Sequence, residues 1–538
     1  MPTARLAALA AALVFLAPDV LAQDAPFEIT VTERTDLANA PALHSGVWAE
    51  HDGLWLFLAG RTNGLHSFGG DAFPREFENG DVVVYDPAAD TQWSASLDGI
   101  APAIAEHLGT TNPQGLHRGD SLIVVGGYGY RPASGEMVTF GAMTVVDVPG
   151  IIEAVQTGGD LAPHLRQPVP WDDALAVTGG HLVEFNGSLT LVGGQRFDGA
   201  YTSASDNPRQ VYTEAIRTFS LGQDGLAGVV EITDPELHRR DGNVAPTVLA
   251  DGTVSVGIYG GVFVPETQGA FVTPIELRPR ARTNDVLEIA EGFVQHTGHY
   301  TAPVLPLYSA QSGAMHTVFL GGINGFTWSD DEGAWDMLGT PPFIPFTDDI
   351  AVITREGDAW SERYLGNLPA TDRSPGLYGT NANVFLNPAL PFHAPGIVDL
   401  DGLAVGTTTL GWFVGGIAAG APSFGQTWAS SRVFEMRLTR AVPPSTQPSA
   451  GLAFALGEAA PNPSHGTTTL DLTLDTPHTL RAEVFDATGR RIAVLHDGPL
   501  GAGTHALTWS ASPSAPGLYL VRVTGPEGSA SRRVVIAR

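Results

Sequence analysis

Residues 180–194 have the sequence Gly-His-Leu-Val-Glu-Phe-Asn-Gly-Ser-Leu-Thr-Leu-Val-Gly-Gly. A β-prone run from His181 to Phe185 is followed by Asn186-Gly187 and then by an apolar run that ends in two glycines. Asn-Gly between two such runs is a strong hairpin signal, because both residues accept a positive φ. The stretch therefore predicts an antiparallel β-hairpin whose second strand ends at a glycine pair.

The second strand of this hairpin recurs along the chain. Apolar runs that end in small residues occupy 54–60, 122–127, 189–194, 254–261, 318–322 and 412–416. Their last glycines stand at 60, 127, 194, 261, 322 and 416, so the intervals are 67, 67, 67, 61 and 94 residues. A period of this length indicates a repeat architecture.

Each repeat offers further strands around this run. A tight turn such as 118–120 (Arg-Gly-Asp) precedes it, a longer loop and a third strand follow it, and a fourth strand often carries a tryptophan, as at Trp93 and Trp360. Four antiparallel strands in each of six units predict an all-β, six-bladed β-propeller. The last interval has room for a seventh blade, but 323–347 and 361–391 are rich in Pro, Gly and Asn and favour an insertion.

Two of the repeats carry a specific resemblance. Residues 180–194 resemble a kelch repeat, and 114–127 match the same pattern without a gap. The other copies are degenerate, since the first ends in Ala59-Gly60. The kelch-like resemblance covers roughly residues 27–440 and implies a propeller with inner strands crowded at its axis, where glycine leaves room for a bend.

The N-terminal segment 27–32 (Phe-Glu-Ile-Thr-Val-Thr) alternates like a strand and has no partner nearby in the sequence. The last repeat offers only three strands of its own before residue 441. We therefore expect 27–32 to pair beside 433–438, which would complete the last blade, close the ring and remove two exposed sheet edges.

A second β module occupies residues 452–538. It carries Pro461-Asn462-Pro463, a turn at 486–490 (Asp-Ala-Thr-Gly-Arg), the segment 500–505 (Leu-Gly-Ala-Gly-Thr-His) and a strand that begins at Pro516-Gly517. This order resembles the C-terminal sorting domains of type IX secretion substrates. The resemblance implies an immunoglobulin-like β-sandwich and the type IX secretion machinery as a partner. The alternative is a plain immunoglobulin-like adhesive module.

The two ends of the chain suggest its destination. Arg5, the apolar run 6–17 and the small residues up to Ala22 predict a signal peptide at 1–22 that is cleaved after Ala22. The Pro- and Ser-rich segment 441–451 predicts a linker after a propeller at 23–440. No other apolar run is long enough to span a membrane. We expect the protein at the outer-membrane surface or outside the cell, reached through the periplasm.

The composition excludes several chemistries. The chain has no Cys, and all 28 basic residues are Arg, so thiolate and lysine chemistry are ruled out. The formal net charge is −29, which argues against nucleic acid as a partner. All of that charge lies in residues 23–451, because the rest balances. Such an excess of acidic residues is typical of proteins kept soluble by self-repulsion. Structural calcium is also possible, because carboxylate oxygens are calcium ligands. No other cofactor and no metal site is predicted, and we expect a monomer.

The candidate site lies on the loops between second and third strands. These loops are long, whereas the turns on the opposite face are short, and long loops on a rigid scaffold are where sites usually sit. They carry aromatic residues, which stack on sugars, and arginines, which make forked hydrogen bonds. The alternative is that these side chains only pack on one another. The candidate ligand-binding residues are Arg61, His66, Tyr128, Tyr130, Arg131, Arg196, Asp198, Tyr201, Trp328 and Trp428.

Two classes of function remain open. We expect the propeller to bind an extracellular glycan or peptide without turning it over, with neutral glycans ranked first because the acidic domain repels anions. The alternative is an extracellular carbohydrate-active or other hydrolytic enzyme, which requires two carboxylates facing each other in a deep mouth. Candidate carboxylates are Asp71, Glu76, Glu78 and Asp198, and no catalytic residue is assigned.

Overall fold

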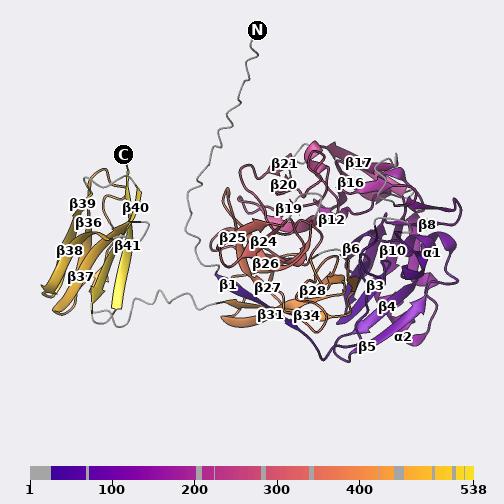
Figure 1. Cartoon of the computed structure of the whole chain (residues 1–538), viewed down its shortest axis with the longest axis horizontal. Helices are drawn as coiled ribbons and strands as arrows, with labels where there is room; N and C mark the ends of the chain where they lie inside the picture. The colour runs from indigo at the N-terminus through magenta and orange to yellow at the C-terminus, as the bar shows by residue number, and fades with distance from the viewer. Residues whose placement is uncertain are drawn as a thin grey trace, which may run out of the picture. The chain divides into compact units, whose positions relative to one another are not determined.

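The computed structural model describes residues 26–67, 72–201, 209–222, 225–279, 286–338, 344–422, 425–440, 454–457, 459–486, 491–511, 517–525 and 528–537. The predicted signal peptide and linker lie outside these residues. The chain divides into two compact units, one that ends at Ala441 and one that begins at Val442 (Figure 1).

The first unit is built from six antiparallel sheets with four principal strands each. The first three sheets contain β2 (Val47–His51), β3 (Leu54–Leu58), β4 (Asp81–Asp86) and β5 (Thr91–Ser96); β6 (Gln114–Arg118), β7 (Ser121–Val125), β10 (Met143–Asp147) and β11 (Leu165–Val169); and β12 (His181–Phe185), β13 (Ser188–Val192), β16 (Ala215–Gly222) and β17 (Gly225–Thr233). The next three contain β18 (Asn243–Val248), β19 (Val254–Tyr259), β20 (Ile275–Arg278) and β21 (Val286–Ile289); β22 (Val304–Ser309), β23 (Ala314–Ile323), β26 (Phe346–Glu356) and β27 (Ala359–Asn367); and β28 (Asn383–Leu386), β31 (Gly406–Val414), β34 (Val433–Arg440) and β1 (Phe27–Glu33).

Smaller elements extend these sheets. The loops between second and third strands contain the hairpins β8 (Tyr128–Arg131) with β9 (Glu136–Thr139), β14 (Gln195–Phe197) with β15 (Gln210–Tyr212), β24 (Phe326–Ser329) with β25 (Ala334–Met337), and β32 (Ile417–Ala419) with β33 (Thr427–Ala429). The strands β29 (Phe392–Ala394) and β30 (Ile397–Asp399) add to the edge at β22 and fill part of the long last interval. The helices α1 (Pro102–Leu108) and α2 (Val148–Thr157) belong to the second repeat.

A circuit of hydrogen bonds joins the six sheets where their first strands begin. The circuit has six members, one for each sheet: Ser45, Asn112, Gly179, Asp241, Thr301 and Asn381. From Asn112 onward, the backbone N–H of each member donates to the backbone carbonyl of the member before it, at 2.7 to 3.3 Å. The side-chain amide of Asn381 donates to the Ser45 hydroxyl at 2.8 Å and completes the circuit. Each member stands two or three residues before a first strand. The sheets therefore follow one another in chain order around the unit (Figure 1).

The glycine pairs end the second strands beside this circuit. At Gly126 the backbone φ is +70°, and an added Cβ would lie 2.1 Å from the carbonyl oxygen of Val177. A side chain at this position would therefore collide with the backbone that leads into the next sheet. The degenerate first copy keeps the same backbone, since Ala59 has a φ of +58°, a conformation that costs a residue with a Cβ more than it costs glycine.

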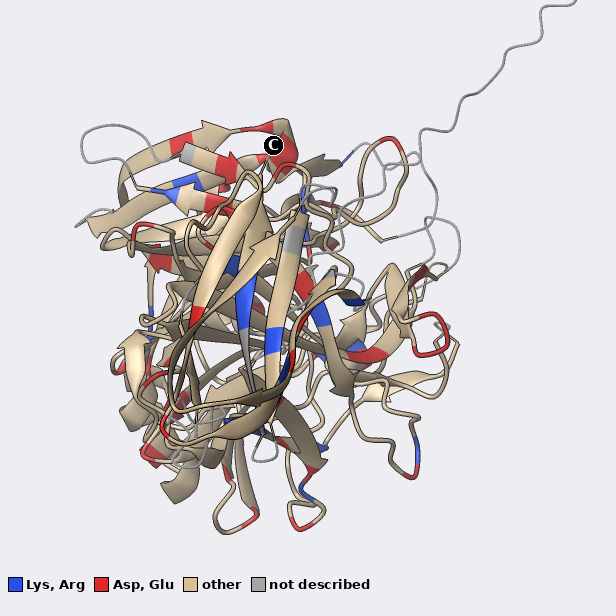
Figure 2. Ribbon diagram, turned by 90° about the vertical axis from the view of Figure 1, so that its left-hand side faces the viewer, with Lys and Arg blue, Asp and Glu red and all other residues tan. Residues whose placement is uncertain are grey.

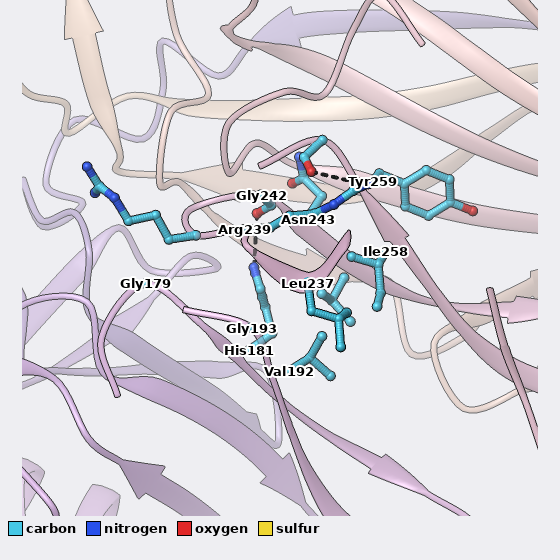
Figure 3. Close-up of a pocket in the computed structure, with 13 residues that line it drawn as sticks. Gly179, His181, Val192, Gly193, Leu237, Arg239, Gly242, Asn243, Ile258 and Tyr259 are labelled. Atoms are coloured by element: carbon cyan, nitrogen blue, oxygen red, sulfur yellow. Dashed lines mark hydrogen bonds between the residues drawn. The ribbon is translucent and has the colours of Figure 1, made fainter. Parts of the chain in front are cut away.

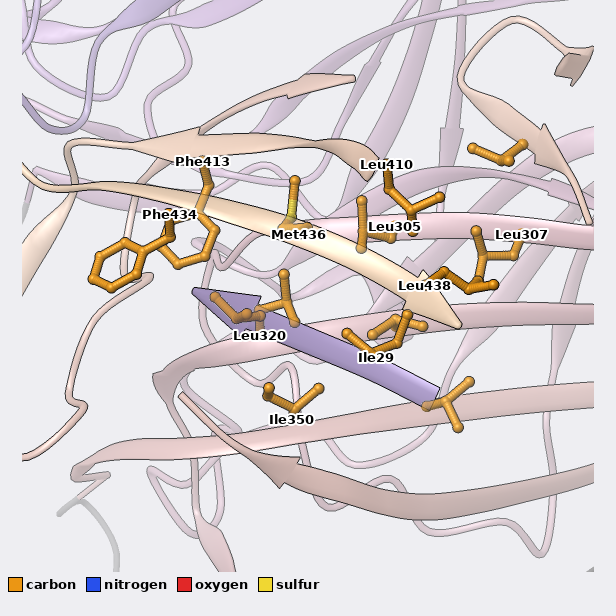
Figure 4. Packing of buried hydrophobic residues seen from close by; sticks show 14 of the residues in the cluster. Ile29, Leu305, Leu307, Leu320, Ile350, Leu410, Phe413, Phe434, Met436 and Leu438 are labelled. Atoms are coloured by element: carbon orange, nitrogen blue, oxygen red, sulfur yellow. The ribbon is translucent and has the colours of Figure 1, made fainter. Parts of the chain in front are cut away.

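The N-terminal strand β1 completes the sixth sheet. It pairs antiparallel with β34 from Phe27 opposite Arg440 to Glu33 opposite Phe434, so the predicted pairing is confirmed. The alternation of the strand buries Phe27, Ile29 and Val31 and exposes the residues between them. Ile29 belongs to a buried apolar cluster with residues of β23, β26 and β34 (Figure 4). The sheet thus joins the start of the unit to its last strand.

The second unit consists of two antiparallel sheets. One contains β35 (Phe454–Leu456), β36 (Thr467–Leu474) and β39 (Gly503–Ser510); the other contains β38 (Arg491–Leu500), β37 (His478–Asp486), β40 (Gly517–Gly525) and β41 (Gly528–Ile536). Buried apolar residues of both sheets, including Leu472, Val484 and Trp509, form one core. The unit therefore has a hydrophobic core of its own, as a β-sandwich requires.

The acidic excess is spread over the fold. Figure 2 shows Asp and Glu on many turns and strands, with few Lys or Arg positions among them. None of the helices in the described part of the chain is long and apolar enough to cross a membrane.

Candidate functional site

A cavity of about 50 Å³ lies beside the hydrogen-bond circuit. Its lining includes residues from the approach to first strands and residues that follow second strands. In five of the repeats these two positions form isolated β-bridges, such as His44 with Arg61 and Thr111 with Tyr128. Because the lining comes from repeats along the whole first unit, the cavity is formed only when the unit is assembled.

Four of the predicted site residues line this cavity: Arg61, His66, Tyr128 and Tyr201. Arg61 is buried and donates to the Asn63 side-chain oxygen at 3.1 Å and to the Pro74 carbonyl at 2.7 Å. The rings of His66 and Tyr201 meet edge to face, with centroids 4.8 Å apart. The first and third loops therefore meet at this cavity.

Three other predicted residues from the second and third loops do not line the cavity. The Arg75 guanidinium lies over the Tyr130 ring, 4.1 Å from its centroid, and Arg131 lies 4.5 Å from the centroid of the Trp171 ring. Arg196 binds the carboxylates of Asp198 at 2.9 Å and Asp173 at 3.2 Å. The Asp198 carboxylate is thus paired and also lies outside the lining. These contacts match the alternative in which loop side chains pack on one another.

The two predicted tryptophans each pack against another side chain. Trp328 stacks on Tyr364 with ring centroids 5.1 Å apart, and its backbone N–H donates to the buried Asp349 carboxylate at 3.3 Å. Burial raises the pKa of Asp349 to about 6. The Trp428 ring faces the Arg373 guanidinium at 4.5 Å. Neither tryptophan lines the cavity.

Sequence reasoning missed other lining residues, including Arg240 and Tyr300. Both residues precede first strands, so they lie outside the loops between second and third strands in which the site was predicted. The period of the repeat offers a signal for part of this set: His44 and Thr111 are 67 residues apart, and Thr178 follows after another 67. Arg61, Tyr128 and Gln195 show the same spacing. Arg240 and Tyr300 fall outside this strict spacing, because the intervals from Thr178 to Arg240 and from Arg240 to Tyr300 shorten to 62 and 60 residues.

The histidines of the cavity are neutral at physiological pH. Burial, helped by the charge of Arg61, lowers the pKa of His44 to about 3. Burial lowers the pKa of His66 to about 4, and the charges of Arg240 and Arg61 act in the same direction. The His44 Nε2 atom is buried without a hydrogen-bond partner in the described structure. The positive charge of the lining therefore comes from its arginines.

Arg240 is held from several sides. Its Nη1 donates to the Asp241 carboxylate at 2.5 Å, its Nε donates to the Tyr212 hydroxyl at 3.2 Å, and its guanidinium lies over the Phe263 ring. Burial raises the pKa of Asp241, and the neighbouring Arg240 charge opposes that rise. Burial also raises the pKa of Tyr300, and the neighbouring Asp241 carboxylate acts in the same direction.

A second, smaller cavity of about 20 Å³ lies between β12, β18 and β19 (Figure 3). His181 Nε2 donates to the Gly242 carbonyl at 2.9 Å beside it. This space is of the order of one buried water molecule. Among the described residues, no group of three or more His, Asp or Glu is arranged to hold a metal ion, so structural calcium stays a prediction.

Comparison with known proteins identifies the C-terminal region. Residues 459–537 match the secretion system C-terminal sorting domain. This is a type IX sorting domain. It directs the chain to export, to the cell surface or the surrounding medium, and implies contact with the type IX secretion machinery.

The remaining comparisons concern structure. The solved structure of YjhT is similar at a TM-score of 0.41 and 13% identity, over 74% of this chain and 96% of that chain. A fungal alcohol oxidase of the AA5 family, in complex with copper, is similar at a TM-score of 0.37 and 10% identity, over 95% of this chain and 99% of that chain. No curated protein matches the sequence.

Proposed function

We propose that the first unit is a kelch-like, six-bladed β-propeller that binds an extracellular glycan at its central cavity. Six four-stranded sheets in chain order support the propeller, as does the circuit of hydrogen bonds between their first strands. Closure of the sixth sheet by β1 is the arrangement that a propeller needs to avoid free edges. On this interpretation residues 1–22 are the signal peptide, 23–440 the propeller and 441–451 the linker.

The single observation that carries the ligand-binding proposal is the composition of the cavity. Aromatic rings from Tyr128, Tyr201 and Tyr300 lie in one lining with side-chain amides and buried arginines. Aromatic faces pack against the apolar faces of sugar rings, and amides and guanidinium groups bond their oxygens. The cavity has a volume of about 50 Å³. We propose that it takes a group at the end of a glycan rather than an extended peptide.

The hydrolytic alternative gains no support from the described residues. None of the described residues in the lining is Asp or Glu. Of the candidate carboxylates, Asp198 is paired with Arg196 and Glu78 lies within 3.8 Å of Arg75. Asp71 lies outside the described residues. The described lining of the cavity therefore supplies no carboxylate for the facing pair that a glycosidase requires.

The proposal can be tested on a glycan array with the mature full-length protein, residues 23–538. Tyr201→Ala removes a ring that lines the cavity, and we expect it to weaken binding by about tenfold or more. Tyr130→Ala is the matched control, because Arg75 already covers that ring outside the cavity, and it should change binding little. Equal losses in both variants, or none in either, would place the site elsewhere. Degradation of the bound glycan would favour an enzyme.

A further inference from the structure

We infer that the glycan recognised by the central cavity ends in an acidic sugar, whose carboxylate binds at Arg240. This inference rests on the proposed function and specifies its ligand. The observation behind it is the state of the Arg240 side chain. Two of its three nitrogens are engaged, Nη1 by Asp241 and Nε by Tyr212. In the described structure its Nη2 has no hydrogen-bond partner, and Arg240 lines the cavity.

An unused N–H edge on a buried guanidinium calls for an acceptor. Arg240 is 9% exposed and lines the cavity, so the cavity is where its Nη2 can meet an acceptor. A carboxylate is the acceptor that fits best, because hydrogen bonds between two charged groups are shorter and about twice as strong as neutral ones. The ion pair with Asp241 and the ring of Phe263 fix the direction of the guanidinium before any ligand arrives.

The chemistry of Arg240 favours a carboxylate over a phosphate. Asp241 already balances the charge of Arg240, so a ligand is held through hydrogen bonds at the remaining edge of the guanidinium. A carboxylate carries one negative charge and is planar, as a guanidinium fork requires. A phosphate monoester would bring nearly two charges close to the Asp241 carboxylate.

The acidity of the whole protein does not oppose such a ligand at contact distance. The net charge of −29 comes from Asp and Glu positions on many turns and strands (Figure 2), and salt at about 0.1 M screens exposed charges beyond roughly 10 Å. The buried arginines act at hydrogen-bond distance in a medium that screens less. Contact with the Arg240 guanidinium therefore outweighs the preference for neutral glycans that the net charge alone predicts.

The test compares acids with their neutral esters on the mature full-length protein. Oligosaccharides that end in glucuronic, galacturonic or N-acetylneuraminic acid would be arrayed beside their methyl esters and beside neutral glycans. We expect at least one acid to bind about tenfold or more tightly than its own ester. Equal binding of acids and esters, or binding of neutral glycans alone, would overturn the inference and leave the proposed function standing. Absence of binding to every glycan would overturn both.

Variants of two arginines locate the effect. Arg240→Lys keeps the charge opposite Asp241 but removes the fork, and we expect the ratio of acid to ester affinity to fall about tenfold with little change for the ester. Arg131→Lys is the matched control, because Arg131 also stacks on an aromatic ring but lies outside the cavity. A folded Arg240→Lys variant with unchanged discrimination would overturn the inference. If that variant does not fold, the comparison of acid with ester on the wild-type protein still decides.

Discussion

At the scale of single residues, the glycine pairs combine an unusual backbone conformation with close packing. Gly126 and Gly119 both have a positive φ, but an added Cβ at Gly119 would have no atom within 4 Å, whereas at Gly126 it would meet the Val177 carbonyl at 2.1 Å. We expect Gly119→Ala to lower the free energy of unfolding by about 1 kcal/mol and Gly126→Ala to lower it by about 3 kcal/mol or more. Thermal and urea unfolding of the two variants would measure the difference. Equal losses would mean that backbone conformation alone explains the glycines.

The candidate site shows what single residues in a sequence can reveal. Arg61, His66, Tyr128 and Tyr201 were predicted because they lie in long loops after second strands, and the cavity gathers them. Arg131 and Arg196 are arginines in loops of the same kind as the loop of Arg61. The Arg131 side chain nevertheless packs on Trp171, and the Arg196 side chain pairs with Asp173. Those pairings depend on how each loop folds back, which the pattern of apolar residues does not determine.

At the scale of elements, the alternation of apolar and polar residues in a strand predicted its pairing partner as well as its local conformation. Because Phe27, Ile29 and Val31 face one side of β1, the sequence already implied a partner with an apolar face, and the missing fourth strand of the last repeat identified it. Hairpin turns were equally predictable, since Asn186-Gly187 joins β12 to β13. The edge strands β29 and β30 were not predicted, because the parallel pairing of β30 with β22 joins segments about 90 residues apart and β29 pairs only with β30.

The role of β1 as the closing strand leads to a test with neighbouring residues. Ile29 is 6% exposed in the apolar cluster of Figure 4, whereas Thr30 on the same strand is exposed. Burying an Ile side chain contributes roughly 1.5–3 kcal/mol, and a buried charge adds a further penalty. We expect Ile29→Asp to lower the free energy of unfolding by about 3 kcal/mol or more and Thr30→Asp to lower it by less than about 1 kcal/mol. Calorimetry would compare them, and similar midpoints would show that β1 contributes little to closure.

At the scale of the whole molecule, the two units differ in charge and in task. Residues 452–538 contain 7 acidic and 7 basic residues, so the net charge of −29 belongs to the rest of the chain. The last strand of the first unit, β34, ends at Arg440, and the division between units follows Ala441. The sorting domain has its own core. Removal of the chain beyond residue 441 therefore deletes no strand from any of the six sheets, including the one that β1 closes.

This separation makes the export signal testable without loss of the cargo fold. We expect a chain that ends at residue 441 to fold and to accumulate in the periplasm, while the full chain reaches the surface or the medium, because residues 459–537 carry the sorting domain. Cell fractionation and protease accessibility of intact cells would locate both forms. The matched control is the full chain with Thr30→Asp, which alters the exposed face of β1, leaves the sorting domain intact and should be exported normally. Circular dichroism and unfolding of the purified short form would show that retention does not come from misfolding. A folded short form in the medium would contradict the assignment, because the first unit would then carry an export signal of its own.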